Sequence, residues 1–329
     1  MKKLLIYLLF APIFACTTSC GSSPTKAGNS EAQPLVRLDS IVATFGQLSE
    51  NQQDSIISVY GGPLSDYLFM MGLTSADLRG SIDTLSHSAA FSVFLPDIAQ
   101  RFNASDSLAM QLAQLETNIS QKLPQLTAAE YFAITSPYRQ SVMLVDSTVF
   151  IALNHYLGAD YDGYRSMPDY AKVEKQWRRI PYDVLRARLA VAYDLRDNYA
   201  DLSQQLLHDG AVDYTMMQLV PDANIGDMLG WTPEQVDLVE RSERQIWETM
   251  VMRNLIYSTD PVDRARLFDA SPATSIISPQ LPGQVGRYMG LKLIEAYVKS
   301  HPDVSLNQLL SPEFAYDRNS FLSAGYSPQ

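Results

Sequence analysis

The helical character of this chain is most evident in residues 106–121, which read DSLAMQLAQLETNISQ. The large aliphatic side chains in this stretch at helical spacing are Leu108, Leu112, Leu115 and Ile119. Their steps of four, three and four residues place them on one stripe of an α-helix. We therefore predict a helix over 106–121 that buries this stripe in the core.

A second helix is predicted to begin near Pro181. Proline suits the first turn of a helix, because its missing N–H would have no partner there in any case. From this start the helical spacing directs Leu185, Leu189 and Ala192 inward. This helix is therefore expected to cover part of the core.

A third helix is predicted by residues 232–235, which read TPEQ. Thr232 can cap the helix, the proline can take the first helical position, and Gln235 can close a capping box. We expect this helix to run through Trp247 to about Ile256.

Two stretches depart from the helical pattern. Glu130–Thr135 and Ser141–Leu153 are rich in aromatic and β-branched residues, and the second alternates around Asp146-Ser147, as in a hairpin. We predict a small antiparallel sheet here. The expected fold class is therefore mainly α with a small antiparallel β-sheet (α+β), and the lack of a fixed repeat argues against a helical-repeat solenoid.

Length and composition allow a large core. The chain has 329 residues, of which 46% are hydrophobic, so it can bury enough apolar surface to fold without disulfides. The formal net charge is −11 and becomes about −13 once Lys2 and Lys3 are removed with a leader. Because so acidic a surface repels phosphate groups, we expect no nucleic-acid partner.

The N-terminus has the parts of a secretory signal. Lys2 and Lys3 form a positive n-region, and the apolar run Leu4–Ala15 is long enough for an h-region but too short to span a bilayer. A cysteine preceded by small residues follows, which is what a lipoprotein signal peptidase recognises. We predict a lipoprotein signal peptide over residues 1–19, with an ordinary secretory signal as the alternative.

Two cysteines compete for the lipid. Gly-Ser-Ser follows Cys20, a flexible start common in mature lipoproteins, so we predict lipid attachment at Cys20, with Cys16 as the alternative. The chain has no further cysteine, so no intrachain disulfide is expected in the folded part. Residues 20–33 are expected to form a flexible tether, and residues 34–329 a single mostly helical domain.

The sequence lacks the usual signatures of a hydrolase. Its histidines are separated by 68, 53 and 93 residues, so no pair shares a helical turn as in a zinc peptidase: His87, His155, His208 and His301. No Gly-x-Ser-x-Gly elbow or phosphate-binding glycine loop is present. Asp160–Gly163 could offer oxygens to calcium, but an aromatic-rich turn is preferred. We predict no cofactor, metal or catalytic residue, although paired-carboxylate chemistry stays open.

Residues 282–290 read PGQVGRYMG. Steps of three and four place Gly283, Gly286 and Gly290 on one side of a helix, where missing side chains let another backbone approach. Glycine inside a helix costs about 1 kcal/mol relative to alanine, so close packing must compensate. We predict a close helix crossing, and the functional alternative is that Arg287 and Tyr288 line a cleft.

Five segments together resemble the gliding-motility lipoprotein B family of Bacteroidetes. They are 150–161 (FIALNHYLGADY), 230–235 (GWTPEQ), 246–247 (IW), 255–260 (LIYSTD) and the glycine segment 282–290. Their order and approximate spacing match over roughly residues 35–325. The resemblance implies an envelope lipoprotein of the apparatus linked to gliding and to its associated secretion system. It does not imply that the host cell glides.

A more remote similarity, to predicted zinc-dependent peptidases, concerns catalysis. Those proteins carry His-Glu-x-x-His on a helix, then a Glu-Gly segment, then Gly-x-x-Gly-Tyr-x-x-Gly. Here the expected metal helix, residues 184–194 (VLRARLAVAYD), has no histidine, and Asp209 stands where Glu would bind zinc. The similarity therefore implies a degenerate zinc-peptidase-like architecture without metal, with Asp209, Arg287 and Tyr288 near the former site.

The function expected from these features is a lipid-anchored, non-enzymatic scaffold or assembly component of the cell envelope. Its expected partners are the membrane, reached through the N-terminal lipid, and other proteins of a gliding or secretion apparatus. Gly21 rather than an aspartate follows Cys20, which favours the periplasmic face of the outer membrane. The alternative is a hydrolase or ligand-binding lipoprotein that uses a pocket on a peptidase-like fold.

Overall fold

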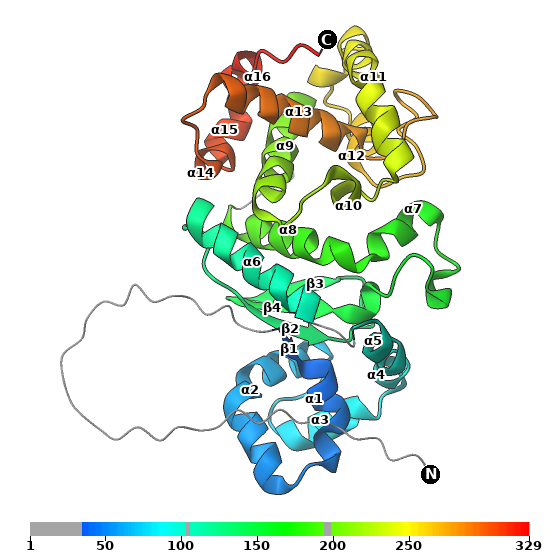
Figure 1. Cartoon of the computed structure of the whole chain (residues 1–329), viewed down its shortest axis with the longest axis vertical. Coiled ribbons are helices and arrows are strands. Elements are labelled where there is room, and N and C mark those ends of the chain that lie inside the picture. The colour runs from blue at the N-terminus through cyan, green and yellow to red at the C-terminus, as the bar shows by residue number, and fades with distance from the viewer. Residues whose placement is uncertain (1–34, 103–105, 194–198, 329) are drawn as a thin grey trace, which may run out of the picture. The chain divides into compact units, whose positions relative to one another are not determined.

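The structure, a computed structural model, describes residues 35–102, 106–193 and 199–328, so the expected signal peptide, the tether and both cysteines lie outside the described residues. Four strands form one sheet in the order β1-β2-β4-β3 (Figure 1). They are β1 (Val36–Arg37), β2 (Glu130–Ile134), β3 (Val142–Val145) and β4 (Thr148–Ala152). β1 pairs with β2 and β2 with β4 in parallel, whereas β3 and β4 are antiparallel.

The predicted hairpin is confirmed, but the prediction of a purely antiparallel sheet is wrong. β3 and β4 turn at Asp146, whose φ is 51°. β2, however, runs parallel to β4 from the Glu130–Thr148 pair to the Ile134–Ala152 pair. After their first residues both strands are buried throughout, as strands in parallel sheets usually are. Unbroken apolar runs were therefore the signal for parallel pairing.

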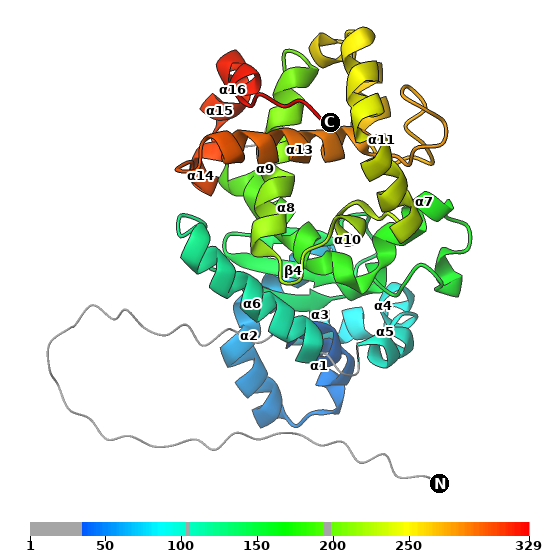
Figure 2. The same ribbon diagram turned by 45° about the horizontal axis from the view of Figure 1, so that its top comes forward.

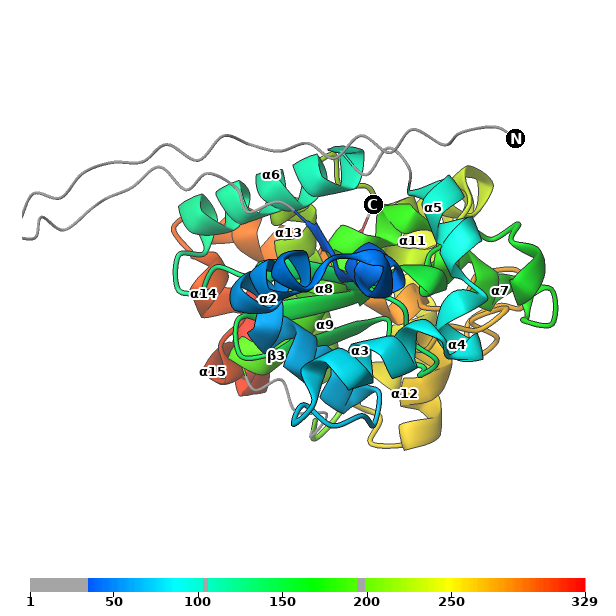
Figure 3. The same cartoon turned by 90° about the horizontal axis from the view of Figure 1, so that it is seen from below.

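The sheet separates two hydrophobic cores. Phe132 and Phe150 face the smaller core, whereas Tyr131 and Ile151 face the larger one, as the alternation of side chains along a strand requires. The helices of the N-terminal part lie on the side of the smaller core (Figures 1 and 3). They are α1 (Leu38–Thr44), α2 (Glu50–Met70), α3 (Leu78–Ser86) and α4 (Ala89–Ser92), followed by α5 (Leu95–Arg101).

The larger core is covered by the remaining helices. They are α6 (Asp106–Lys122), α7 (Asp169–Lys172), α8 (Ile180–Ala192), α9 (Leu202–Leu219), α10 (Ile225–Leu229), α11 (Pro233–Met252), α12 (Pro261–Phe268), α13 (Val285–Ser300), α14 (Leu306–Leu309), α15 (Pro312–Tyr316) and α16 (Arg318–Ser323). Short 3₁₀ turns are η1 (Phe45–Gln47), η2 (Leu153–His155), η3 (Asp162–Tyr164), η4 (Val173–Lys175), η5 (Trp177–Arg179) and η6 (Leu255–Tyr257). Within the described ranges, no helix is both long and apolar enough to cross a bilayer.

The layers of this part follow the chain. α6 and α8 lie next to the sheet, and α9 rises from them to cross α13 (Figures 1 and 2). α8 is held over the sheet by the buried Arg188, which donates to Glu116 on α6, to the Tyr131 hydroxyl on β2 and to the Thr127 carbonyl. The fold class, mainly α with a small sheet, is confirmed.

The predicted helices are confirmed in their positions, with two corrections. The stripe of α6 is buried as expected, from Leu108 at 2% exposure to Leu115 at 0%. Ala192, expected to face inward, is exposed because α8 ends there and the chain leaves the core. The predicted capping box of α11 is present, but the helix ends at Met252 rather than near Ile256, because Asn254 adopts a left-handed conformation with φ 55°.

Candidate functional site

The centre of the larger core is a close crossing of α9 and α13. A Cβ atom built on Gly210 would lie 2.2 Å from the carbonyl oxygen of Gly290, so the two backbones are in direct contact. Gly286 instead faces α12, where a Cβ would lie 2.9 Å from the carbonyl oxygen of Leu267. The predicted close crossing is confirmed, although Gly283 precedes α13 and packs instead on the backbone of Ser271.

Arg287 and Asp213 form a bidentate ion pair beside this crossing. Nε and Nη2 of Arg287 donate to the two carboxylate oxygens of Asp213 at 2.9 and 2.6 Å, and Nη1 donates to Gln284 Oε1 at 2.8 Å. Arg287 is 7% exposed and Asp213 is fully buried. All three nitrogen groups of this guanidinium are therefore occupied by the protein itself.

Arg186 of α8 extends the pair into an ion cluster, which we define as Arg186, Asp209, Asp213 and Arg287. Its two terminal nitrogens donate to Asp213 at 3.2 Å and to Asp209 at 3.3 Å. Burial by itself would raise the pKa of Asp209, but a hydrogen bond from His208 and the nearby guanidinium groups outweigh burial and lower this pKa to about 2. Asp209 is therefore ionised at neutral pH and is a very weak base.

Tyr288 belongs to a different part of the core. Its hydroxyl donates to Glu243 Oε2 on α11 at 2.6 Å, and its ring packs on Trp231 with a centroid distance of 6.0 Å. Burial and the adjacent Glu243 carboxylate raise the pKa of this hydroxyl well above its usual range. Tyr288 follows Arg287 directly, and neighbouring residues on a helix point in different directions.

The structure thus brings Asp209 and Arg287 together and directs Tyr288 elsewhere. The segments singled out by the peptidase similarity, on α8, α9 and α13, do meet at the ion cluster, although residue 194 lies outside the described ranges. Sequence reasoning missed Arg186 and Asp213. Asp209 and Asp213 are four residues apart on one face of α9, and this spacing was the available signal.

The histidines and the aspartate turn show how the chain uses its other polar groups. His155 links two turns through Ser141 Oγ and the carbonyl oxygen of Ser136. Residues 160–163 lie in an aromatic turn, in which the rings of Tyr161 and Tyr164 meet edge to face at 5.0 Å. Among the described residues, no group of three or more His, Cys, Asp or Glu side chains is arranged to hold a metal ion.

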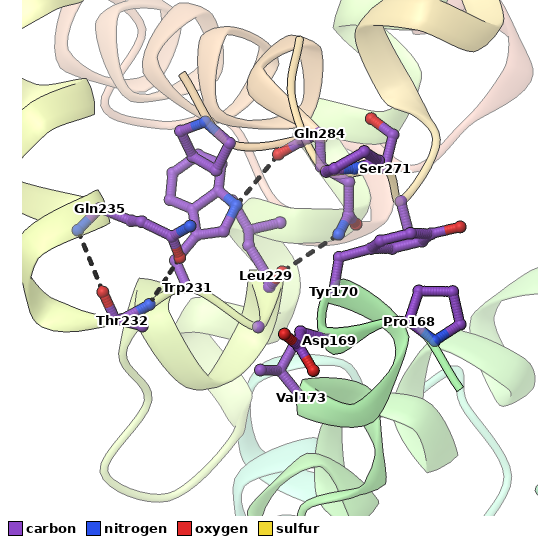
Figure 4. Close-up of a pocket in the computed structure, with 15 residues that line it drawn as sticks. Pro168, Asp169, Tyr170, Val173, Leu229, Trp231, Thr232, Gln235, Ser271 and Gln284 are labelled. Atoms are coloured by element: carbon purple, nitrogen blue, oxygen red, sulfur yellow. Dashed lines mark hydrogen bonds between the residues drawn. The ribbon is translucent and has the colours of Figure 1, made fainter. Parts of the chain in front are cut away.

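A sizeable hollow lies beside the ion cluster rather than at it. It has a volume of 500 Å³ and is formed by the loop around α7, the α10–α11 turn and the segments 270–272 and 282–284 (Figure 4). None of Asp209, Arg287 and Tyr288 lines it. Gln284 and Trp231 form its inner wall, and behind that wall they contact Arg287 and Tyr288 respectively. Arg287 and Tyr288 therefore support this hollow from behind.

Gln284 holds this wall in an unusual conformation. Its φ is 68°, in the left-handed region that glutamine rarely adopts. Its side-chain oxygen accepts from Arg287, and its Nε2 donates to the carbonyl oxygen of Leu229 at 3.1 Å, so α13 is tied to the α10–α11 turn (Figure 4). Backbone strain of this kind is found preferentially at ligand sites.

These observations define a mainly helical α+β protein with a small mixed sheet and a self-paired ion cluster in its core. Residues 26–328 match the family described as gliding motility protein GldB, and the chain belongs to this family. The match confirms the resemblance drawn from the five segments. No curated protein and no solved structure matches the chain. Family membership associates the protein with gliding motility and with the cell envelope.

Proposed function

We propose that this protein is a lipid-anchored scaffold or assembly component of the gliding-motility apparatus and has no catalytic activity of its own. Family membership supports the link to gliding motility. The proposed anchor is a diacylglycerol on Cys20, with Cys16 as the alternative, and the proposed location is the periplasmic face of the outer membrane. The partners are then the membrane and other envelope proteins of the apparatus.

The ion cluster is the observation that carries the non-catalytic part of this proposal. A general base needs an accessible group whose pKa lies near the working pH. Asp209 is buried and has a pKa of about 2, and Asp213 is committed to Arg287 through both oxygens. Charged groups that pair with one another in this way hold the helices together. They leave no free carboxylate or guanidinium in the cluster to bind a substrate.

We further propose that the fold is a degenerate zinc-peptidase architecture. In this proposal α8, α9 and α13 correspond to the metal helix, the second ligand segment and the glycine helix. Arg186 then lies on the helix that would have carried the two histidines, and its guanidinium supplies a positive charge between Asp209 and Asp213. A cation supplied by the chain itself would stabilise these carboxylates without metal.

The second candidate function is a ligand-binding lipoprotein, and one observation favours it. The 500 Å³ hollow has the size of a small-molecule or peptide site, and a strained Gln284 lies in its wall. Binding through this hollow is compatible with a scaffold as well as with a solitary binding protein. The two functions differ in whether the protein stays associated with other envelope proteins.

Affinity purification of the tagged full-length protein from its own envelope tests the proposal. The detergent extract would be analysed by mass spectrometry for co-purifying proteins and by elemental analysis for zinc. We expect several gliding or secretion components and no stoichiometric zinc. A solitary protein that carries about one zinc atom per chain would overturn both the scaffold and the degenerate-peptidase proposals.

A matched control separates specific partners from detergent aggregates. In the variant Gly290→Ala the helix crossing is expected to be damaged, whereas Gly61→Ala adds only an ordinary van der Waals contact on α2. Partners that bind the folded domain should be lost with the first variant and kept with the second. Proteins recovered equally with both variants would be bound to the tag, the tether or the micelle.

A further inference from the structure

Two hollows adjoin at Trp231. The 500 Å³ hollow described above and a second one of 390 Å³ share Val173, Gly230, Trp231 and Thr232 in their walls. We call the combined depression the Trp231 cleft, the first hollow its apolar lobe and the second its arginine lobe. Because these four residues border both lobes, one extended ligand could occupy the whole cleft.

The apolar lobe offers few free polar groups. Pro168, Pro272 and Pro282 line it and have no backbone N–H. The Trp231 indole N–H donates to the carbonyl oxygen of Gly283 at 3.0 Å. An apolar side chain can therefore enter this lobe without leaving protein donors unsatisfied.

Several polar side chains that line the apolar lobe are also engaged by the protein, whereas Asp169 and Tyr170 are exposed. Thr232 and Gln235 are occupied by each other in the capping box of α11 (Figure 4). Gln284 uses both ends of its amide on Arg287 and Leu229. A hydroxyl-rich ligand in this lobe would lose hydrogen bonds to water and gain few from the protein, which costs free energy.

The arginine lobe has the opposite character. Arg101 and Arg178 are exposed and form no ion pair with any residue that the structure describes. The guanidinium of Arg178 lies over the ring of Trp177 at 5.7 Å, a cation–π contact that favours this position. In a chain of formal charge −11, two such arginines form a local positive site.

A third arginine lies deeper in the same lobe. Arg179 is 8% exposed and donates to the carbonyl oxygen of Met228 at 2.9 Å and to Asp183 at 3.4 Å. Its buried Nε has no hydrogen-bond partner among the described residues, which is unusual for a buried donor. Among the described residues that line this lobe, the one carboxylate is that of Asp227, which accepts from Asn224 at 2.6 Å. The lobe therefore attracts a negative charge.

We propose that the Trp231 cleft binds a peptide segment of a partner protein in which a carboxylate lies next to a bulky apolar side chain. The apolar side chain occupies the lobe formed by the prolines, Tyr170 and Trp231, and the carboxylate meets Arg101, Arg178 and Arg179. This inference rests on the proposed scaffold function and names the surface through which a partner is held. Arginine clusters and aromatic-lined grooves are both established means of peptide recognition.

An array of fluorescein-labelled hexapeptides tests the specificity directly. Each peptide carries one apolar residue (Phe, Leu, Trp or Pro) and one Glu at every possible spacing, in an otherwise Gly-Ser background. Binding to the full-length protein in detergent micelles is measured by fluorescence anisotropy. We expect binding by peptides with adjacent or near-adjacent apolar and acidic residues. Replacing Glu by Gln, or the apolar residue by Ser, should weaken it about tenfold.

Variants of the protein locate the binding site. Arg101→Gln with Arg178→Gln removes two exposed charges and should weaken the best peptides about tenfold. Arg139→Gln with Arg241→Gln removes the same charge from exposed positions that do not line the cleft, and should leave binding unchanged. Tyr170→Ser should weaken binding without changing its dependence on salt.

Three outcomes overturn the inference. The first is that no peptide of the array binds, and the second is that the two double variants bind equally. The third is that an oligogalacturonate binds at the cleft while the peptides do not, which would assign the cleft to an anionic glycan.

The envelope purification separates the cleft from the scaffold function. If partners are still recovered with the Arg101→Gln, Arg178→Gln protein, the scaffold function stands but does not use the cleft. If instead the protein purifies alone but still binds the peptides, the cleft is a peptide site and the scaffold function is removed.

Discussion

Gly210 and Gly290 are in van der Waals contact across the crossing of α9 and α13, backbone against backbone. A Cβ on Gly290 would lie 2.6 Å from the carbonyl oxygen of Leu206 and 3.1 Å from the amide nitrogen of Gly210. Contacts this short with main-chain atoms cannot be relieved by rotating a side chain. The two helices can therefore approach this closely only with glycine at both positions.

We expect Gly290→Ala to destabilise the protein by about 3 kcal/mol or more, because overpacking costs about 1–3 kcal/mol even where side chains can adjust. Gly61→Ala on α2 is the control. Its Cβ would meet Ile57 at an ordinary 3.7 Å, and replacing a helical glycine should stabilise by about 0.5–1 kcal/mol. Urea unfolding followed by circular dichroism measures both. Equal effects would show that the crossing is looser than described.

Removing one partner of the Arg287–Asp213 pair should leave an uncompensated buried charge. We expect Arg287→Met to cost about 3–5 kcal/mol of unfolding free energy. The double variant Arg287→Met, Asp213→Leu should be more stable than the single one, because it buries no unpaired charge. Thermal or urea unfolding of the set measures this coupling. If the effects of Arg287→Met and of Asp213→Leu alone simply added up to that of the double variant, the ion pair would be contradicted.

The stability of the fold should depend on pH through His155. Burial, with the nearby Lys175, lowers the pKa of this imidazole from 6.5 to about 4, whereas the hydrogen bond to Ser136 opposes the shift. The unfolded chain then binds a proton more readily than the folded one. The neutral His155 therefore contributes to the free energy of unfolding, fully above pH 6.5. This contribution is lost as the pH falls towards 4, by about 2–3 kcal/mol.

The variant His155→Gln tests this pH dependence, because glutamine does not titrate. Urea unfolding of both proteins between pH 7 and pH 4 should give a flatter curve for the variant, and the difference between the two should shrink as the pH falls. Parallel curves over the whole range would show that His155 titrates alike in the folded and unfolded states.

The lipid attachment site can be assigned by metabolic labelling. Cys20→Ala should abolish incorporation of labelled palmitate and release the protein from the membrane fraction, because loss of the acyl chains removes the anchor. Cys16→Ala should keep both properties. The reverse pattern would assign the lipid to Cys16, and membrane retention of the double variant would refute a lipid anchor.

Local patterns in the sequence predicted local structure well. The stripe from Leu108 to Ile119 and the cap at Thr232 depend on residues within one or two turns, so spacing alone was sufficient. The orientation of β2 against β4 depends on where the chain goes between them, and a hairpin between β3 and β4 suggested an antiparallel partner for every strand. The unbroken apolar runs of both strands favour the parallel arrangement.

The candidate site was less accessible to sequence reasoning. Asp209 and Arg287 were found through a remote similarity, whereas Arg186 and Asp213 become relevant only when α8, α9 and α13 meet. The apolar lobe of the Trp231 cleft alone is built from four separate segments, and neither spacing nor composition joins Pro168 to Gly283. Sites of this kind are properties of the tertiary fold.

The short edge strand β1 has a mechanical consequence for an anchored protein. β1 has only two residues, and the chain passes from it directly into α1, where Leu38 and Asp39 are fully buried. Arg37 clamps this junction by donating to both oxygens of Asp39 at 2.7 and 2.6 Å. With the proposed lipid anchor, a pull transmitted through the N-terminal segment would therefore separate at most one short strand before the load reached a buried helix. β1 would detach first, and the buried start of α1 would then resist further unfolding.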